Sequence, residues 1–125
     1  MDEKIIRQDI SKEFYFKEGC YIIEQYNSPE DPSLSIARVR VEPGKKTRWH
    51  RLKDTIERYY ILKGTGIMEV GTMQPKEVYP GDLVVIPPLC AQRIKNNGTE
   101  DLLFLAICTP RFESKNYEDI EDYAF

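Results

Sequence analysis

Residues 44–64, "GKKTRWHRLKDTIERYYILKG", hold the only histidine of the chain beside a strand-like run. His50 lies in "TRWHRL", and Glu57 lies in the segment that follows, "TIERYYILKGTGIMEV". In that segment Gly64 and Gly66 bracket a tight connection, as glycines do between two strands. The window therefore predicts strands joined by a short turn, and it raises the question of whether His50 and Glu57 belong to one site.

Strand-like segments continue on both sides of this window, from Ser33 to Pro110. The segment "SLSIARVRVEPG" alternates between two faces and ends at a Pro-Gly turn, which is typical of a strand. Further strands are predicted in "EVYPGDLVVIPP", "AQRIKNNG" and "LLFLAICTP". No helical periodicity separates these strands, so the sequence predicts an all-β sandwich or barrel.

The composition is that of a globular domain, with 125 residues, 41% of them hydrophobic and 31% charged. We therefore expect residues 1–125 to form a single domain. No segment approaches the roughly 20 apolar residues that a membrane-spanning helix requires, and the charged N-terminus lacks the apolar core of a signal peptide. These features predict a soluble, cytoplasmic protein with no membrane partner.

Charge and cysteine content exclude two further classes. The net charge is −3 and the lysines are scattered, so no basic face is available for nucleic-acid binding. Cys20, Cys90 and Cys108 are far apart and form no C-x-x-C pair. We expect reduced thiols rather than a disulfide framework or a cysteine zinc site.

Two motifs resemble those of the cupin family. The first cupin motif places a His-x-His pair and a glutamate between two glycines, and the second places a proline, a histidine and an asparagine after a glycine. The residues that match the first motif are Gly44, His50, Glu57 and Gly64. Those that match the second, in "GDLVVIPPLCAQRIKN", are Gly81, Pro87 and Asn96. The resemblance covers about residues 33–112.

This resemblance implies a fold and an assembly. The expected fold is all-β, a cupin double-stranded jelly-roll β-barrel with short N- and C-terminal extensions and a site in the barrel interior. Cupins are commonly dimers, so a homodimer is expected.

The chain departs from the family at three motif positions. Leu52 stands where the first motif has its second histidine, Gln92 where the second motif has its histidine, and Leu89 where that motif has a glycine. The metal ligands that the resemblance leaves are His50, Glu57 and Gln92.

The ion expected at such a set is divalent Zn, Mn, Fe, Co or Ni, because imidazole, carboxylate and amide donors suit these metals. It would polarise a substrate oxygen as a Lewis acid. In the alternative there is no metal, and the guanidinium of Arg48 pairs with the buried carboxylate of Glu57. Both remain open.

Strand alternation extends the candidate site. Side chains at every second position share a face, so Arg48 is expected beside His50, and Tyr59 beside Glu57. Glu57 and Tyr59 are the candidate catalytic residues, since a phenol can act as a general acid or base. Arg48, Tyr59 and Gln92 are the candidate ligand-binding residues. In the alternative, Tyr59 only lines the barrel, with Tyr60 on the outer face.

The predicted function is a small-molecule-binding cupin that acts as a divalent-metal-dependent isomerase, epimerase or lyase on a small polar metabolite, carboxylate- or sugar-like. The alternative is a metal-free, non-catalytic ligand-binding or sensor cupin. The C-terminal segment "ESKNYEDIEDYAF" is acidic and aromatic. It is either a frayed end, a lid, or a short helix docked through Tyr117, Ile120 and Tyr123.

Overall fold

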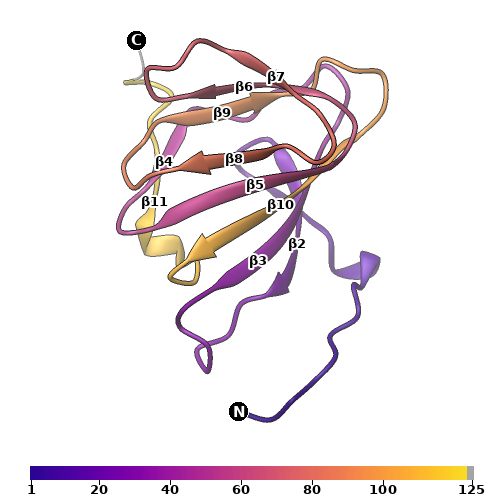
Figure 1. Cartoon of the computed structure of the whole chain (residues 1–125), viewed down its shortest axis with the longest axis vertical. Coiled ribbons are helices and arrows are strands. Elements are labelled where there is room, and N and C mark those ends of the chain that lie inside the picture. Colours follow the sequence, from indigo (N-terminus) through magenta and orange to yellow (C-terminus); the bar gives the residue numbers. More distant parts are fainter. Residues whose placement is uncertain (124–125) are drawn as a thin grey trace.

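The computed structural model describes residues 1–123, which fold into two antiparallel sheets that face each other (Figure 1). The larger sheet has the strand order β1 (Phe14–Phe16), β2 (Cys20–Tyr26), β3 (Ser35–Val41), β10 (Leu102–Thr109), β5 (Ile56–Lys63) and β8 (Leu83–Ile86). The smaller has the order β11 (Tyr117–Asp119), β4 (His50–Leu52), β9 (Gln92–Lys95), β6 (Gly66–Val70) and β7 (Lys76–Val78). The all-β, double-sheet prediction is confirmed.

Strand β10 shows why these sequences form sheets. Its side chains alternate, with Leu102, Phe104, Ala106 and Cys108 buried and the intervening residues partly exposed. The strand lies between β3 and β5, so its buried face sits at the centre of the core. The ring of Phe104 packs on that of Tyr59 with centroids 4.3 Å apart. Each such apolar side chain contributes about 1.5–3 kcal/mol by leaving water.

Gly64 makes the predicted turn between β5 and β6. Its φ is +82°, and a Cβ there would come within 2.7 Å of the carbonyl oxygen of Asp101. Any other residue would be strained and would clash with the backbone. The glycine therefore lets β5 and β6 connect close to the start of β10.

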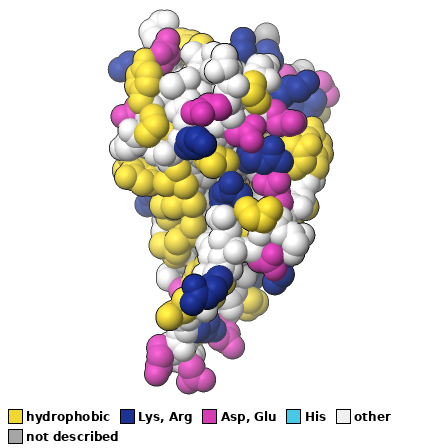
Figure 2. Space-filling view, turned by 90° about the vertical axis from the view of Figure 1, so that its right-hand side faces the viewer, with side chains coloured by type: hydrophobic (Ala, Val, Ile, Leu, Met, Phe, Trp, Pro, Cys, Tyr) yellow, Lys and Arg dark blue, Asp and Glu magenta, His cyan; other side chains and the backbone are white. Residues whose placement is uncertain are grey.

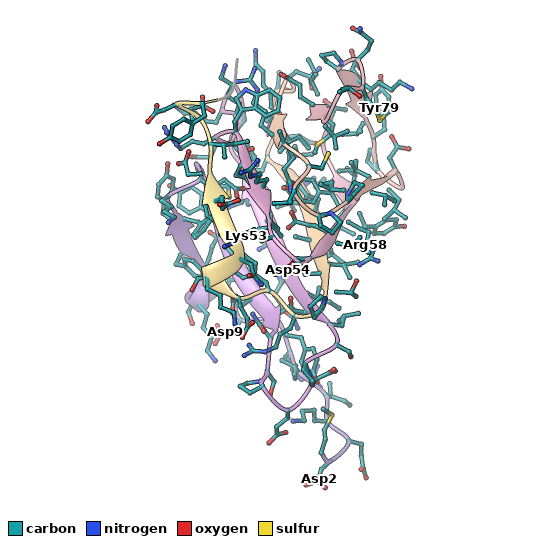
Figure 3. All side chains as sticks on the ribbon, turned by 90° about the vertical axis from the view of Figure 1, so that its left-hand side faces the viewer. Asp2, Asp9, Lys53, Asp54, Arg58 and Tyr79 are labelled. Atoms are coloured by element: carbon teal, nitrogen blue, oxygen red, sulfur yellow. The ribbon has the colours of Figure 1, made fainter. Side chains whose placement is uncertain are left out.

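Both ends of the chain add strands to the barrel. The N-terminal part forms a short 3-10 helix η1 (Ile10–Lys12) followed by β1 and β2. The chain before η1 runs past the end of β2, where the Ile6 carbonyl accepts a hydrogen bond from Nε2 of Gln25 (Figures 1 and 3). The C-terminal part forms a second 3-10 helix η2 (Ser114–Asn116) followed by β11. Where the chain turns between β4 and β5, near Lys53 and Asp54 (Figure 3), the Lys53 N–H donates to the Asn116 carbonyl at 2.8 Å.

The tail is thus docked, but as a strand rather than as the short helix expected through Tyr117, Ile120 and Tyr123. Tyr117 pairs with Leu52 in the β11–β4 register, and the Ile120 N–H donates to the carbonyl of Trp49 at 3.0 Å. Tyr123 is 86% exposed and anchors nothing. The last two tail residues, 124 and 125, lie outside the described part of the chain. In the described part, none of the helices has the length and apolarity to cross a membrane.

Candidate functional site

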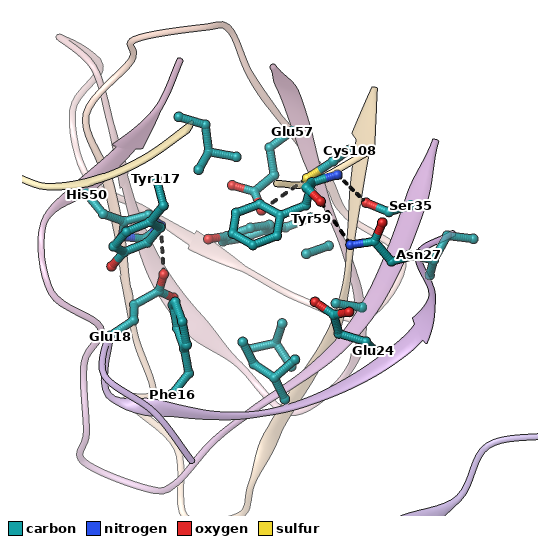
Figure 4. Close-up of a pocket in the computed structure, with 17 residues that line it drawn as sticks. Phe16, Glu18, Glu24, Asn27, Ser35, His50, Glu57, Tyr59, Cys108 and Tyr117 are labelled. Carbon is teal, nitrogen blue, oxygen red and sulfur yellow. Dashed lines mark hydrogen bonds and ion pairs between the residues drawn. The ribbon is translucent and has the colours of Figure 1, made fainter. Parts of the chain in front are cut away.

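A pocket opens between the two sheets and narrows toward His50 and Glu57 (Figure 4). Its enclosed space is about 60 Å³, enough for about two water molecules or the reacting end of a small ligand. Apolar side chains cover one part of the wall, namely Phe16, Ile22, Ile36, Ala37, Val39, Leu52, Ala106 and Phe112. Polar side chains converge on the rest, as expected of a small-molecule site.

The strongest polar contact in the pocket joins His50 to Glu18. Nδ1 of His50 lies 2.7 Å from the carbonyl oxygen of Arg48, and Nε2 lies 3.1 Å from Oε1 of Glu18. A carbonyl only accepts, so Nδ1 carries a proton and Nε2 faces the carboxyl group. Either the imidazole is charged beside a carboxylate, or it is neutral and accepts from a protonated Glu18. In both arrangements one proton lies between the two buried side chains.

The local backbone explains how Glu18 reaches this position. Glu18 lies in the turn between β1 and β2, and its carbonyl accepts a hydrogen bond from the Arg48 N–H at 2.8 Å. The next residue, Gly19, has φ +104°, and a Cβ there would lie 3.2 Å from the Lys46 carbonyl. The glycine lets the turn press against the segment before β4, which brings Glu18 to the histidine.

Glu57 forms a second buried polar cluster. The amide Nε2 of Gln92 donates to Oε1 of Glu57 at 2.9 Å, and the thiol of Cys108 lies 3.7 Å from Oε2. Burial raises the pKa of Glu57 to about 7, and the nearby carboxylate of Glu18 adds to this, whereas His50 opposes it. Glu57 is therefore poised to exchange a proton near neutral pH.

Tyr117 covers the histidine from the C-terminal strand. Its ring stacks on the imidazole of His50 with centroids 5.4 Å apart and planes 18° apart, and it meets the edge of Phe16. Burial raises the pKa of its phenol, so the hydroxyl keeps its proton. This hydroxyl is buried and has no hydrogen-bond partner among residues 1–123. A ligand group in the pocket would provide one.

The predicted metal ligands come together but do not form a metal site. His50 and Gln92 are cross-strand partners in the β4–β9 pair. However, Gln92 points its amide nitrogen at Glu57, and the free nitrogen of His50 is occupied by Glu18. In the described chain no three His, Cys, Asp or Glu side chains converge on one point. A divalent ion of the expected kinds needs at least three protein ligands, so this donor set does not fit one.

Arg48 lies elsewhere than predicted. Its Nε donates to Asp119 Oδ2 at 2.7 Å on the surface, and the side chain is 43% exposed. The expectation that Arg48 shares the pocket face of His50 and pairs with Glu57 is wrong. Strand β4 begins at His50, so strand alternation does not extend back to Arg48.

The tyrosine pair behaves as predicted. Tyr59 is 2% exposed and lines the pocket, and burial raises the pKa of its phenol well above the usual range. Tyr60 lies on the outer face. Gln92 is fully buried behind Glu57, where it holds that carboxyl group.

Sequence reasoning missed Glu18, Glu24 and the pocket position of Tyr117, and it left open which face of its strand Cys108 occupies; all four residues line the pocket. The first three lie outside the cupin motifs. The available signal was the alternation of Cys20, Ile22 and Glu24 on one face of "GCYIIEQY", which predicts an inward-facing acid at the end of β2.

Comparison with known proteins places these observations in a family. Residues 37–108 match the family model described as "Cupin domain". The whole chain is 33% identical to the glucose-6-phosphate isomerase of Pyrococcus abyssi and covers 71% of that protein. It covers only 60% of the corresponding enzyme of Thermococcus onnurineus, with 33% identity over 84% of this chain.

Two further relatives match almost end to end. The uncharacterized protein MJ1618 of Methanocaldococcus jannaschii is 32% identical over 94% of this chain and 97% of its own. Among solved structures, Pac13, a nucleoside dehydratase, superimposes with a TM-score of 0.75 over 94% of this chain and 92% of its own, at 18% identity. The latter similarity is one of fold.

Proposed function

The chain belongs to the cupin domain family, and on this premise we propose that its barrel binds a small polar metabolite and catalyses a proton transfer on it. The reaction class is isomerisation, epimerisation or elimination. Because the metal ligands expected from the family do not converge here, the proposed chemistry uses only side chains of the chain.

One observation carries this proposal: two separate proton carriers line the same pocket. The Glu18–His50 pair holds a proton between buried groups, and Glu57 has a pKa of about 7. General acid–base catalysis is most effective when the catalytic pKa is close to the working pH. Two titratable groups in different environments allow one to act as a base while the other acts as an acid.

The roles follow from the contacts. When the shared proton lies on Nε2 of His50, the carboxylate of Glu18 takes a proton from a carbon or hydroxyl of the ligand, and the imidazolium stays hydrogen-bonded to it. Glu57, when protonated, donates to the ligand oxygen or leaving group on the other side. Gln92 orients Glu57, and the free hydroxyl of Tyr117 donates a hydrogen bond to the ligand. Tyr59 closes the wall of the pocket beside Glu57.

The relatives support this reaction class without fixing the substrate. Several are glucose-6-phosphate isomerases, and one fold neighbour is a dehydratase. Both names describe reactions in which protons move between carbon and oxygen.

The test is solvent hydrogen exchange. Sugars, polyols, amino alcohols and nucleosides are incubated with the protein in D2O, and deuterium incorporation or product formation is followed by NMR. His50→Gln and Glu57→Gln are each expected to reduce the rate by about 100-fold or more. Tyr60→Phe, on the outer face, is the control. Full activity in both pocket variants would reject the proposal.

A second candidate function is ligand binding without turnover. The observation that favours it is the hydroxyl of Tyr117, a buried polar atom of the pocket wall without a partner among residues 1–123, since such an atom is ready to recognise a ligand. Under this alternative, ligands raise the unfolding temperature of the protein but never exchange hydrogen with solvent.

A cytoplasmic location and a homodimer are also proposed. The free thiols of Cys20, Cys90 and Cys108 support the first, because cysteines persist unpaired in reducing compartments. The apolar outer face of the larger sheet supports the second and is considered in the Discussion.

A further inference from the structure

We propose that the pocket takes an unphosphorylated, non-anionic ligand that presents hydroxyl or ammonium groups to it. The inference rests on the proposed function for its location, but it concerns the charge of the ligand and not its reaction. The proposed ligand class is narrower than the carboxylate- or sugar-like class expected from sequence. It differs in charge from the phosphorylated sugar named for the glucose-6-phosphate isomerase relatives.

The charges around the pocket are the first support. Glu18, Glu24 and Glu57 line it, on different walls (Figure 4), whereas none of its lining residues within the described chain is a lysine or arginine. His50 is the only side chain there that can become positive, and it is already held by Glu18. A phosphate dianion would therefore enter a site with carboxylates and no unpaired cation, which is unfavourable at low dielectric.

Three cationic side chains have partners at or next to the pocket wall, and Asn27, the partner of Arg111, itself lines the pocket. Arg48 is paired with Asp119. Arg111 donates to Asn27 and pairs with Glu113, and Lys17 lies over the outer ring face of Tyr117 at 5.2 Å from its centroid. These residues do not form a phosphate-binding arrangement such as an arginine fork or a helix N-terminus.

The free polar atoms are the second, independent support. Glu24 is solvent-exposed and points into the pocket from β2 (Figure 4), and its carboxylate makes no hydrogen bond or ion pair with any residue of the described chain. The hydroxyl of Tyr117 is buried and also without a partner. A carboxylate only accepts hydrogen bonds, whereas a phenol both donates and accepts them, so it is Glu24 that sets the charge preference. Ligand hydroxyl or ammonium groups satisfy both side chains, whereas phosphate oxygens, which are acceptors, repel the carboxylate.

The experiment compares matched ligand pairs by calorimetry at low ionic strength. The pairs are glucose and glucose 6-phosphate, glucosamine and glucosamine 6-phosphate, ribose and ribose 5-phosphate, and glycerol and glycerol 3-phosphate. We expect the unphosphorylated member of each binding pair to be preferred by about tenfold or more. Tighter or equal binding of any phosphorylated member would overturn the proposal, as would the absence of binding by every unphosphorylated member.

Charge variants locate the effect. Glu24→Lys is expected to raise the affinity for phosphorylated members by about tenfold and to weaken glucosamine binding, with Glu24→Gln in between. Glu30→Lys makes the same charge change on the surface outside the pocket and is expected to leave the preference unchanged. An equal effect of Glu30→Lys would mean that net charge, and not the pocket, sets the preference, which also overturns the proposal.

These measurements are independent of turnover. Preference for unphosphorylated ligands without hydrogen exchange would reject the proposed catalysis and keep this inference. Hydrogen exchange on phosphorylated ligands would support the proposed catalysis and reject the inference about ligand charge.

Discussion

Oε1 of Glu18 lies 3.1 Å from Nε2 of His50 in the interior of the barrel. The histidine belongs to a cupin motif, whereas the glutamate comes from the turn between β1 and β2, before the region that matches the family. The pair therefore joins a motif residue to a residue outside the segment that matches the family model. It supplies a buried proton at the position where the family motif predicts a metal ligand.

Loss of the Glu18 carboxyl group should destabilise the protein. Glu18→Ala leaves the buried Nε2 of His50 without a partner, and we expect a loss of about 1–3 kcal/mol in the free energy of unfolding. Glu18→Gln should cost less, because an amide still forms a hydrogen bond. Urea denaturation measures both, with Glu24→Ala as the exposed control. Equal costs for Glu18→Ala and Glu24→Ala would contradict the pairing.

Stability should fall as the pH rises through neutrality because of Glu57. The unfolded carboxyl group releases its proton near pH 4.5, whereas the folded one, with its pKa at about 7, still holds it. Between these values the folded state binds more protons, so the free energy of unfolding decreases with pH by up to about 3 kcal/mol and then levels off. Glu57→Gln removes this contribution. Urea denaturation of both proteins at pH 5 and pH 8 checks it, and identical pH dependence would refute it.

The hydroxyl of Tyr117 should matter for ligands and not for folding. Because it has no partner in the described chain, Tyr117→Phe should change the free energy of unfolding by no more than about 0.5 kcal/mol. Tyr117→Ala removes the ring that packs on His50 and Phe16 and should cost roughly 2 kcal/mol or more. In ligand titrations Tyr117→Phe should bind more weakly than the native protein. A large folding defect in Tyr117→Phe would show that the hydroxyl is already satisfied.

The native protein should contain little metal, and two substitutions should give it a metal site. No three His, Cys, Asp or Glu side chains of residues 1–123 converge on one point, so elemental analysis of protein purified without chelator or nickel resin should find no stoichiometric Zn, Mn, Fe, Co or Ni. The double variant Leu52→His/Gln92→His returns the two family histidines to the pocket and should take up about one equivalent. About one equivalent in the native protein, lost in His50→Ala, would contradict our assignment.

The outer face of the larger sheet should mediate a homodimer. Tyr60, Leu62, Leu83 and Val85 are each 40–57% exposed on adjacent strands β5 and β8, and apolar side chains gather on the side shown in Figure 2. Exposed apolar patches of this kind mark interfaces, and a two-fold dimer uses the same patch twice.

Light scattering after gel filtration should therefore give twice the chain mass for the native protein. Leu83→Glu should yield the monomer, while Ile10→Glu, an equally exposed site in η1 next to the opposite edge of the larger sheet, should not. A native monomer at micromolar concentration would refute the dimer.

The strands of the barrel could be predicted from sequence because their signals are local. Alternation places Phe104 and Cys108 on the buried face of β10, and Gly64 makes the turn it indicates. His50 and Gln92 meet as the motif spacing implied. The burial pattern of β10 and the Gly64 turn depend on residues close together in the chain, whereas the meeting of His50 and Gln92 follows from the two family motifs.

The remaining parts of the site depend on contacts that sequence patterns do not encode. The predicted position of the Arg48 side chain is wrong because β4 starts later than the sequence pattern suggests. Glu18 reaches His50 through a backbone hydrogen bond to the segment before β4, and Tyr117 does so through the β11–β4 pairing. Which distant segments pair is decided by the tertiary packing, so neither residue carried a recognisable signal.

The pocket wall is completed by Glu18 from one end of the described chain and Tyr117 from the other, on a barrel whose family motifs contain neither residue. The site is therefore shared between the barrel, which supplies His50 and Glu57, and the two flanking segments, which supply Glu18 and Tyr117. Exchanging the flanking segments between related barrels would change the partners of the histidine while the sheets and the two motif residues stay the same.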